Sequence, residues 1–217
     1  LTKRFNENHQ LSLTAFGAPQ WHNQRNNANG LTISGWQQVK QYVEDPEDIY
    51  QYNPSFGYRK NGVAYNQNQN KYNKPQISLN HQWQIDHKSS LSTVAYVSIG
   101  RGYGTSGQAN TELGASRSDW YAANKGILST KFRNADGTFA YDQMEELNEQ
   151  SMNGSLYAMS ISKNYHNWYG LVSTYTTKFG EYVDFYGGVD FRYYKGTHTN
   201  EISDLFGGKF FMDVDSR

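Results

Sequence analysis

Two stretches of the chain, 74–103 and 168–195, carry the same alternation of polar and apolar side chains. In the first stretch the even positions from Gln76 to Gln84 are polar, while the odd positions include Ile77, Leu79 and Trp83. Strict alternation predicts a β-strand with one apolar face and one polar face. Each stretch has a short polar turn near its centre, so we expect two β-hairpins with strands of roughly ten residues.

Five strands are predicted along the chain, at 9–17, 75–85, 90–100, 168–177 and 182–194. The turns 86–89 and 178–181 are short, whereas the segments 18–73 and 101–167 are long and rich in Asn, Gly and Tyr. Short turns at one end of the strands and long loops at the other are typical of outer-membrane β-barrels. We therefore predict an all-β fold, a section of a large antiparallel transmembrane β-barrel with long extracellular loops, and assign 1–217 to that single barrel domain.

The long segments carry weaker signals of local structure. Residues 35–43 (GWQQVKQYV) predict a short helix ended by Pro46, residues 142–150 predict a second helix, and Asn134–Gly137 reads as a hairpin turn. Residues 155–163 also alternate. A spanning strand there would put long loops at both ends of the sheet, so we interpret it as ordered loop structure at the outer end of the strand 168–177.

Composition favours the barrel over a soluble domain. Hydrophobic residues make up 36% of the chain, charged residues 18% and aromatic residues 16%. A soluble domain usually has more charged and aliphatic residues, whereas a barrel needs apolar side chains on one face only and concentrates aromatic residues at the membrane interfaces. The mean hydropathy of −0.85 therefore fits a membrane barrel. No apolar run approaches the ~18 residues of a spanning helix.

The alternation assigns side chains to two environments. On the apolar face we expect side chains in contact with lipid: Ile77, Leu79, Leu91, Val97, Val189 and Phe191. On the polar face we expect side chains that point into the lumen: Asn80, Gln82, Tyr96, Asp190 and Arg192. A shift of one residue in the pairing would exchange the two sets, so the register is the point to check.

No pattern in the chain predicts catalysis. Gly100–Gly104 lacks the Lys-Ser/Thr of a phosphate-binding loop, and the six His residues lack metal-ligand spacing. We interpret Asp184, Asp190 and Arg192 as paired charges in a watery lumen. The chain has no Cys and a net charge of zero, which excludes a disulfide framework and gives little support to nucleic-acid binding. We expect no enzyme activity, no cofactor and no metal, although the acidic run 44–48 leaves weak binding of a divalent cation open.

The long segments are the candidates for ligand binding. Aromatic side chains mixed with Asn, Gln and Gly offer flat apolar faces beside hydrogen-bonding groups, which suits sugars, peptides or metal chelates. The candidates in these loops are Trp36, Tyr50, Tyr52, Trp120 and Tyr121.

The amino-acid sequences of seven successive segments resemble those of one family of barrels. The segments are LTAFGAPQWH at 13–22, YNPSFGY at 52–58, NKPQ at 73–76, YVSIGRG at 96–102, NWYG at 167–170, GVDFRYYKGTH at 188–198 and DLFGG at 204–208. Together they resemble the barrel of TonB-dependent outer-membrane receptors of the type with a carboxypeptidase-regulatory-like N-terminal extension. The resemblance covers essentially the whole chain.

This resemblance implies a 22-stranded barrel in the outer membrane of a Gram-negative bacterium, closed by a plug and energised by TonB. The chain starts at Leu1 and ends in a polar segment, Met212–Arg217, so we expect an internal piece of a larger protein or a mature product cut at both ends. The resemblance implies that the plug lies outside this piece. The expected partners are outer-membrane lipid, TonB through the plug, a surface lipoprotein, and a scarce nutrient such as a metal chelate, haem, cobalamin, glycan or peptide. Two alternatives stay open: a passive porin or structural barrel, and a secreted β-sandwich that binds carbohydrate.

Overall fold

The structure, a computed structural model, describes residues 1–25 and 30–213. It is mostly β with antiparallel sheets, as predicted. The polar C-terminal segment 212–217 lies outside the described residues from position 214 onward, as do positions 26–29 of the first long segment.

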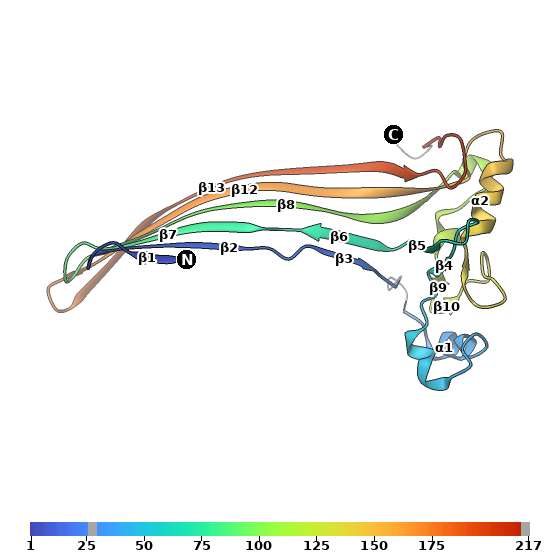
Figure 1. Ribbon diagram of the computed structural model, residues 1–217, viewed down its shortest axis with the longest axis horizontal. Coiled ribbons are helices and arrows are strands. Elements are labelled where there is room, and N and C mark those ends of the chain that lie inside the picture. Colours follow the sequence, from blue (N-terminus) through green and yellow to red (C-terminus); the bar gives the residue numbers. More distant parts are fainter. Residues whose placement is uncertain (26–29, 214–217) are drawn as a thin grey trace. The chain divides into compact units, whose positions relative to one another are not determined.

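The main sheet is built from long antiparallel strands that lie side by side (Figure 1). The order is β1-β2-β7-β8-β12-β13, with β3 paired to β6 and β6 paired to β8. The bounds are β1 Thr2–Arg4, β2 His9–Phe16, β3 Gln20–Asn23, β6 Gln69–Asn73, β7 Gln76–Gln84, β8 Ser90–Ala109, β12 Tyr157–Phe179 and β13 Val183–Asp204. In the described part of the chain β1 and β13 are edge strands, so the sheet is open.

The hairpin prediction is confirmed, and the structure adds a third hairpin. The turns 85–89 and 180–182 connect β7 to β8 and β12 to β13, and β1 pairs with β2 across a turn that the sequence did not predict. Asp86 closes the first turn by accepting hydrogen bonds from the backbone N–H groups of Lys88 (2.7 Å) and Ser89 (2.9 Å). The alternation of short turns with long segments therefore holds along the whole sheet.

The predicted strand lengths were wrong for three strands. β8, β12 and β13 contain 20, 23 and 22 residues, about twice the expected length. Residues 101–104 are predicted to begin the second long loop but lie inside β8, and residues 155–163 are largely the first part of β12 rather than ordered loop. The direction of the chain is not reversed there, because β12 continues without a break into the predicted strand 168–177.

The long segments fold into smaller elements. They comprise α1 Ile33–Val39, β4 Phe56–Tyr58, β5 Ala64–Asn66, β9 Ala123–Asn124, β10 Ile127–Leu128, β11 Phe139–Ala140 and α2 Tyr141–Gln150, together with short 3-10 turns at Pro46–Gln51, Thr111–Leu113 and Arg117–Trp120. Strands β11, β4 and β5 form one small sheet, and β9 and β10 form another.

Both predicted helices exist, with different starts. The first begins at Ile33 because the Oγ1 atom of Thr32 caps it by accepting a hydrogen bond from the N–H of Gly35 (3.2 Å). It ends at Val39, four residues before the predicted end, and Pro46 begins the following 3-10 turn instead of ending the helix. The predicted turn at Asn134–Gly137 is confirmed by a 3.0 Å hydrogen bond from the N–H of Gly137 to the carbonyl oxygen of Asn134.

The chain divides into two compact units, each assembled from separate stretches of sequence. Unit 1 contains residues 1–20, 72–102 and 163–198, and unit 2 contains residues 21–71, 103–162 and 199–217. Among the described residues, every buried hydrophobic side chain lies in unit 2. The larger core cluster of unit 2 includes Trp120, Phe139, Tyr141, Tyr157 and Phe206. Unit 1 is therefore a sheet without a hydrophobic core of its own in the described chain.

Candidate functional site

The sheet of unit 1 separates the two sets of predicted side chains. The register pairs Ile77 with Val97, Leu79 with Ala95 and Trp83 with Leu91, so these odd-numbered side chains share one face. It pairs Ser78 with Tyr96 and Gln82 with Ser92 on the opposite face, where Asn80 also lies. The side chains expected to meet lipid on β7 and β8 thus lie together, opposite those expected to line a lumen. Which environment each face meets stays a prediction.

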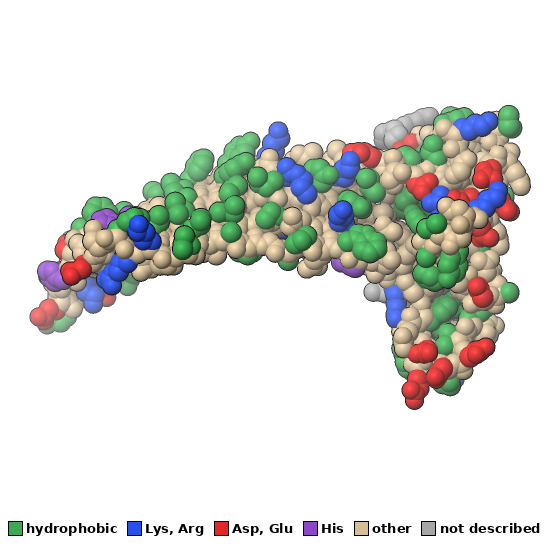
Figure 2. All heavy atoms as spheres, viewed as in Figure 1, with side chains coloured by type: hydrophobic (Ala, Val, Ile, Leu, Met, Phe, Trp, Pro, Cys, Tyr) green, Lys and Arg blue, Asp and Glu red, His purple; other side chains and the backbone are tan. Residues whose placement is uncertain are grey.

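The apolar face of this sheet is uncovered. Ile77 and Leu79 are 49% and 42% exposed, and Val189 and Phe191 on β13 are 64% and 65% exposed. Leu13, Ile99, Leu171, Val183 and Phe185 are further large hydrophobic side chains at odd positions with extensive exposure. Figure 2 shows such hydrophobic side chains at the surface along the strands. Contiguous apolar surface of this kind marks a face that contacts a membrane or another protein.

The opposite face of unit 1 satisfies its polar groups locally. The amide of Gln82 donates a hydrogen bond to the Oγ of Ser92 (2.7 Å). On β13 the guanidinium of Arg192 donates two hydrogen bonds to the carboxylate of Asp190, at 2.9 and 2.6 Å. The ring of Tyr96 packs edge-on against Trp168 at 5.8 Å between centroids. This face carries charged and hydrogen-bonding groups that suit water, which is what a lumen would contain.

The loop candidates in unit 2 divide between surface and core. Tyr50 is 71% exposed and its ring lies 5.5 Å from that of half-buried Trp36, while Tyr121 is 40% exposed. Trp120 is only 3% exposed, and its indole N–H donates to the carbonyl oxygen of Gln108 at 2.8 Å. Trp120 therefore packs the core of unit 2, whereas Tyr50 and Tyr121 present ring surface to solvent.

Tyr52 contacts a half-buried cation, Arg133, that the sequence did not single out. Its hydroxyl donates to the carbonyl oxygen of Gly137 (2.7 Å) and accepts from Arg133 (3.2 Å). The same guanidinium donates to the carbonyl oxygens of Pro54 (2.7 Å) and Ala122 (2.8 Å). Burial raises the pKa of Tyr52, so its phenol stays neutral at physiological pH. Arg133 also donates to the carbonyl oxygen of Gly137 (3.0 Å), and so connects three backbone segments of unit 2 through their carbonyl groups.

A cavity of about 390 Å³ opens beside Tyr52. Its lining residues come from the first long segment and from the 134–138 turn: Tyr42, Gln51, Tyr52, Asn53, Phe56, Asp136, Gly137 and Thr138. The turn reaches the cavity because Gly137 adopts a backbone φ of 83°, and the Tyr42 ring lies where a Cβ at this position would be.

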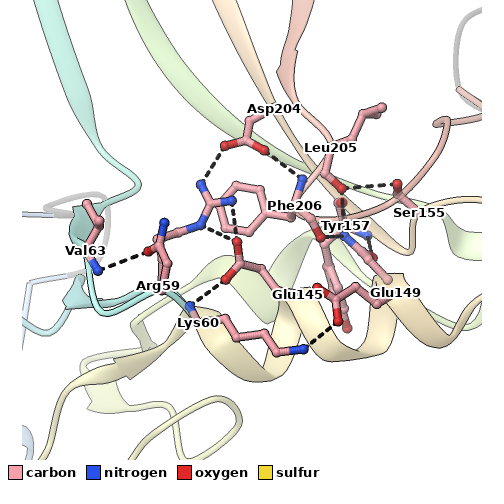
Figure 3. A network of polar contacts seen from close by, with 12 residues as sticks. Arg59, Lys60, Val63, Glu145, Glu149, Ser155, Tyr157, Asp204, Leu205 and Phe206 are labelled. Carbon is pink, nitrogen blue, oxygen red and sulfur yellow. Dashed lines mark hydrogen bonds and ion pairs between the residues drawn. The ribbon is translucent and has the colours of Figure 1, made fainter.

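A second network of charges holds the long segments of unit 2 together (Figure 3). The guanidinium of Arg59 donates to Asp204 at 2.6 Å and forms a close ion pair with Glu145 of α2. The backbone N–H of Lys60 donates to the other Glu145 oxygen (2.7 Å), and the Lys60 ammonium pairs with Glu149 (2.6 Å). This network connects the segment after β4, helix α2 and the end of β13.

Stacking adds to the same network. The guanidinium of Arg59 lies 4.1 Å from the ring centroid of Phe206 and 5.3 Å from that of Tyr65. Burial alone would lower the pKa of Arg59, but its hydrogen bonds to Asp204 and Glu145 raise it. The sequence contains no local signal for Arg59 or Arg133, because an isolated charge in a polar segment looks the same whether it is buried or solvated.

Comparison of the chain with protein-family models, curated proteins and solved structures found no match. The similarity to TonB-dependent receptors therefore stays a prediction. In the described part of the chain, no helix has the length and hydropathy needed to span a bilayer. The described residues also contain no group of three or more His, Cys, Asp or Glu side chains placed to hold a metal ion.

Proposed function

We propose that this chain is a section of an outer-membrane TonB-dependent receptor that binds and imports a scarce nutrient. The observation that carries the proposal is the uncovered apolar face of unit 1. Every buried hydrophobic side chain of the described residues lies in unit 2. In unit 1, Ile77, Leu79, Val189 and Phe191 are exposed, and Leu91 and Val97 are half-buried. Lipid would cover this face at no cost, because hydrocarbon is as apolar as the side chains themselves.

The arrangement of turns supports an orientation across the membrane. Outer-membrane barrels place short turns in the periplasm and long loops outside the cell. By this rule the turns 85–89 and 180–182 are periplasmic, and the segments 17–75 and 110–156 are extracellular. A barrel strand crosses the apolar layer with ~9–11 residues. The remaining residues of β8, β12 and β13 would then extend beyond the bilayer. Ala109 at the end of β8 and Tyr157 and Met159 at the start of β12 belong to the core of unit 2.

The folded long segments support a receptor rather than a passive pore. A plain structural loop would have little need of a packed core, two charge networks and a lined cavity. Small-molecule sites are preformed concave surfaces that combine apolar walls with a few convergent polar groups. TonB would act through a plug region, which is not among these strands, and outer-membrane lipid would contact the apolar face.

Spin labels in the intact receptor, reconstituted into lipid vesicles, test the proposal. We expect a label at Leu79 to be accessible to oxygen, which partitions into lipid, and shielded from a water-soluble paramagnetic quencher. A label at Gln82, on the opposite face of the same strand, should show the reverse. Water accessibility at Leu79 would contradict the membrane assignment.

A further inference from the structure

We propose that the cavity beside Tyr52 binds a neutral sugar ring, so that an uncharged saccharide is the ligand captured by the outer segments. This inference deepens the proposed function and rests on it for its biological role. The binding site itself lies wholly within unit 2, and all its lining residues come from positions 42–56 and 136–138. Its volume of about 390 Å³ lies within the range of small-molecule sites, roughly 300–1,000 Å³.

The walls of the cavity offer flat apolar surfaces. The rings of Tyr42 and Tyr52 are nearly parallel, with an angle of 10° and centroids 6.3 Å apart. Phe56 lines the same cavity, and its ring is held edge-on by Tyr58 at 5.3 Å. A pyranose ring presents a face of C–H groups that packs on such rings, while its hydroxyl groups point outward around its edge.

The polar groups of the cavity suit hydroxyl groups at that edge. Gln51 and Asn53 supply side-chain amides. The Nε2 of Gln51 donates to Asp48 and the Oδ1 of Asn53 accepts from the backbone N–H of Ser55, so the Gln51 Oε1 can accept from a ligand and the Asn53 Nδ2 can donate to it. Asp136 accepts two bonds from Thr138, from its backbone N–H (2.9 Å) and its hydroxyl (2.6 Å), both on Oδ1. Within the described residues Oδ2 accepts no further hydrogen bond, so it can accept one from a ligand hydroxyl. The bonds from Thr138 also lower the pKa of Asp136, which keeps this acceptor ionised at neutral pH.

The charges around the cavity favour a neutral ligand over an ion. Asp136 contributes one negative charge at the cavity. Behind its wall the guanidinium of Arg133 donates to the carbonyl oxygen of Gly137 (3.0 Å) and to the Tyr52 hydroxyl. Arg133 would repel an organic cation drawn to the aromatic rings and Asp136, while Asp136 would repel a carboxylate drawn to Arg133. An uncharged polyhydroxyl ring is repelled by neither Arg133 nor Asp136.

A saccharide array probed with the full-length purified receptor tests this inference. The array carries neutral, carboxylated and amine-bearing mono- and oligosaccharides. We expect binding to members of the neutral class, with Asp136→Asn weakening it at least tenfold because a charge-assisted acceptor is lost. Tyr42→Leu should weaken binding to a similar extent by removing a flat wall. The matched control is Tyr182→Ala, which removes a 94% exposed tyrosine in the β12–β13 turn and should leave binding unchanged.

Several outcomes would overturn the inference. They are binding to no neutral saccharide, binding confined to amine-bearing or carboxylated probes, and neutral binding that Asp136→Asn leaves intact. Circular dichroism and hydrogen exchange of unit 2 show whether Tyr42→Leu still folds, and the surface variant Asp136→Asn keeps the test decisive if it does not. The spin-label experiment separates the two proposals. If no neutral saccharide binds while Leu79 faces lipid, only the proposed ligand class is contradicted. If a neutral saccharide binds while Leu79 is accessible to water, only the membrane assignment is contradicted.

Discussion

Trp120 and Tyr50 are both aromatic residues of the long segments, but they differ in burial and therefore in role. Trp120 packs edge-on against Tyr157 and Phe206, at 6.0 and 5.3 Å between centroids, and is almost fully buried. Tyr50 has most of its ring in solvent. A buried aromatic side chain holds a fold together, while an exposed one is available to a ligand.

We predict that Trp120→Ala destabilises unit 2 by roughly 3–5 kcal/mol, because it leaves a large cavity in a packed core. Tyr50→Ala should change the free energy of unfolding by less than about 0.5 kcal/mol, as expected for a surface site. Denaturant unfolding of the intact protein, followed by hydrogen exchange in unit 2, measures both. Equal stability of the two variants would contradict the core role of Trp120.

Asp119 makes the stability of unit 2 depend on pH. Its Oδ2 atom is 2.7 Å from the ammonium of Lys131, and accepts hydrogen bonds from the Tyr157 hydroxyl (2.7 Å) and the Ser116 N–H (2.9 Å). Burial alone would raise the pKa of Asp119, but these three partners together hold it below its ordinary value. The carboxylate therefore stabilises the fold at pH values above the ordinary pKa of about 4, and this contribution is lost as pH falls through the lowered pKa.

We expect hydrogen-exchange protection of residues 116–121 to be high at pH 7 and to fall below about pH 4. In Asp119→Asn, protection should already be reduced at pH 7 and should change little on acidification. Glu112→Gln is the matched control, since it removes an exposed carboxyl from the same segment and should behave like the wild type. A wild-type profile that is flat between pH 7 and pH 3 would show that Asp119 does not stabilise this segment.

At the scale of single elements, successive side chains of strand β7 point to opposite faces of the sheet. Leu79 pairs with Leu13 and Ala95 on one face, and the neighbouring Asn80 pairs with Ser12 and Val94 on the other. Substitutions at Leu79 and Asn80 therefore compare the two faces of the sheet at nearly the same position along the strand.

We predict that Leu79→Arg destabilises the receptor in lipid vesicles by roughly 2–4 kcal/mol, if this position lies near the middle of the bilayer. Asn80→Arg should cost much less, because its side chain would point toward water. Denaturant titrations in vesicles measure the two differences in unfolding free energy. A larger cost for Asn80→Arg would mean that the assignment of faces is inverted.

In the proposed orientation the long segments lie outside the cell and the short turns lie in the periplasm. The chain contains no Cys, so single cysteines can be introduced without interference from residues of this section. Met152, 81% exposed after α2, is a better site for a reporter than Gly137, which is buried beneath Tyr42.

We expect a membrane-impermeant maleimide to label Met152→Cys on whole cells and to label His87→Cys only after the outer membrane is permeabilised. The reason is that outer-membrane barrels, the class proposed for this chain, have extracellular long loops and periplasmic short turns. Labelling of His87→Cys, but not of Met152→Cys, on intact cells would invert the topology.

At the scale of the whole molecule, the sheet has two edges. β13 is 22 residues long and β1 is the opposite edge strand, and each presents backbone N–H and C=O groups along one side. In lipid each unsatisfied group costs several kcal/mol, and in water an exposed edge is a template for aggregation.

We therefore predict that residues 1–217 expressed alone aggregate or stay unfolded in both detergent and vesicles. Size-exclusion chromatography and gel mobility before and after heating measure this. A monomeric, heat-modifiable, β-rich product inserted in vesicles would show that the chain is complete enough to fold without further strands.

Alternation along the sequence was enough to predict the hairpins, their turns and the division of Ile77 and Leu79 from Asn80 and Gln82, because the two-residue period of a strand is a local property. The full lengths of β8 and β12 depend on tertiary contacts. The sequence predicts that the strand ends at Gly100, yet β8 continues beyond it, and the ring of His166 from β12 packs over Gly100 where a Cβ would collide. Burial of Trp120 and the contacts of Arg59 and Arg133 likewise join residues that are far apart in the chain. Only the folded arrangement supplies these partners, so no sequence window contains them.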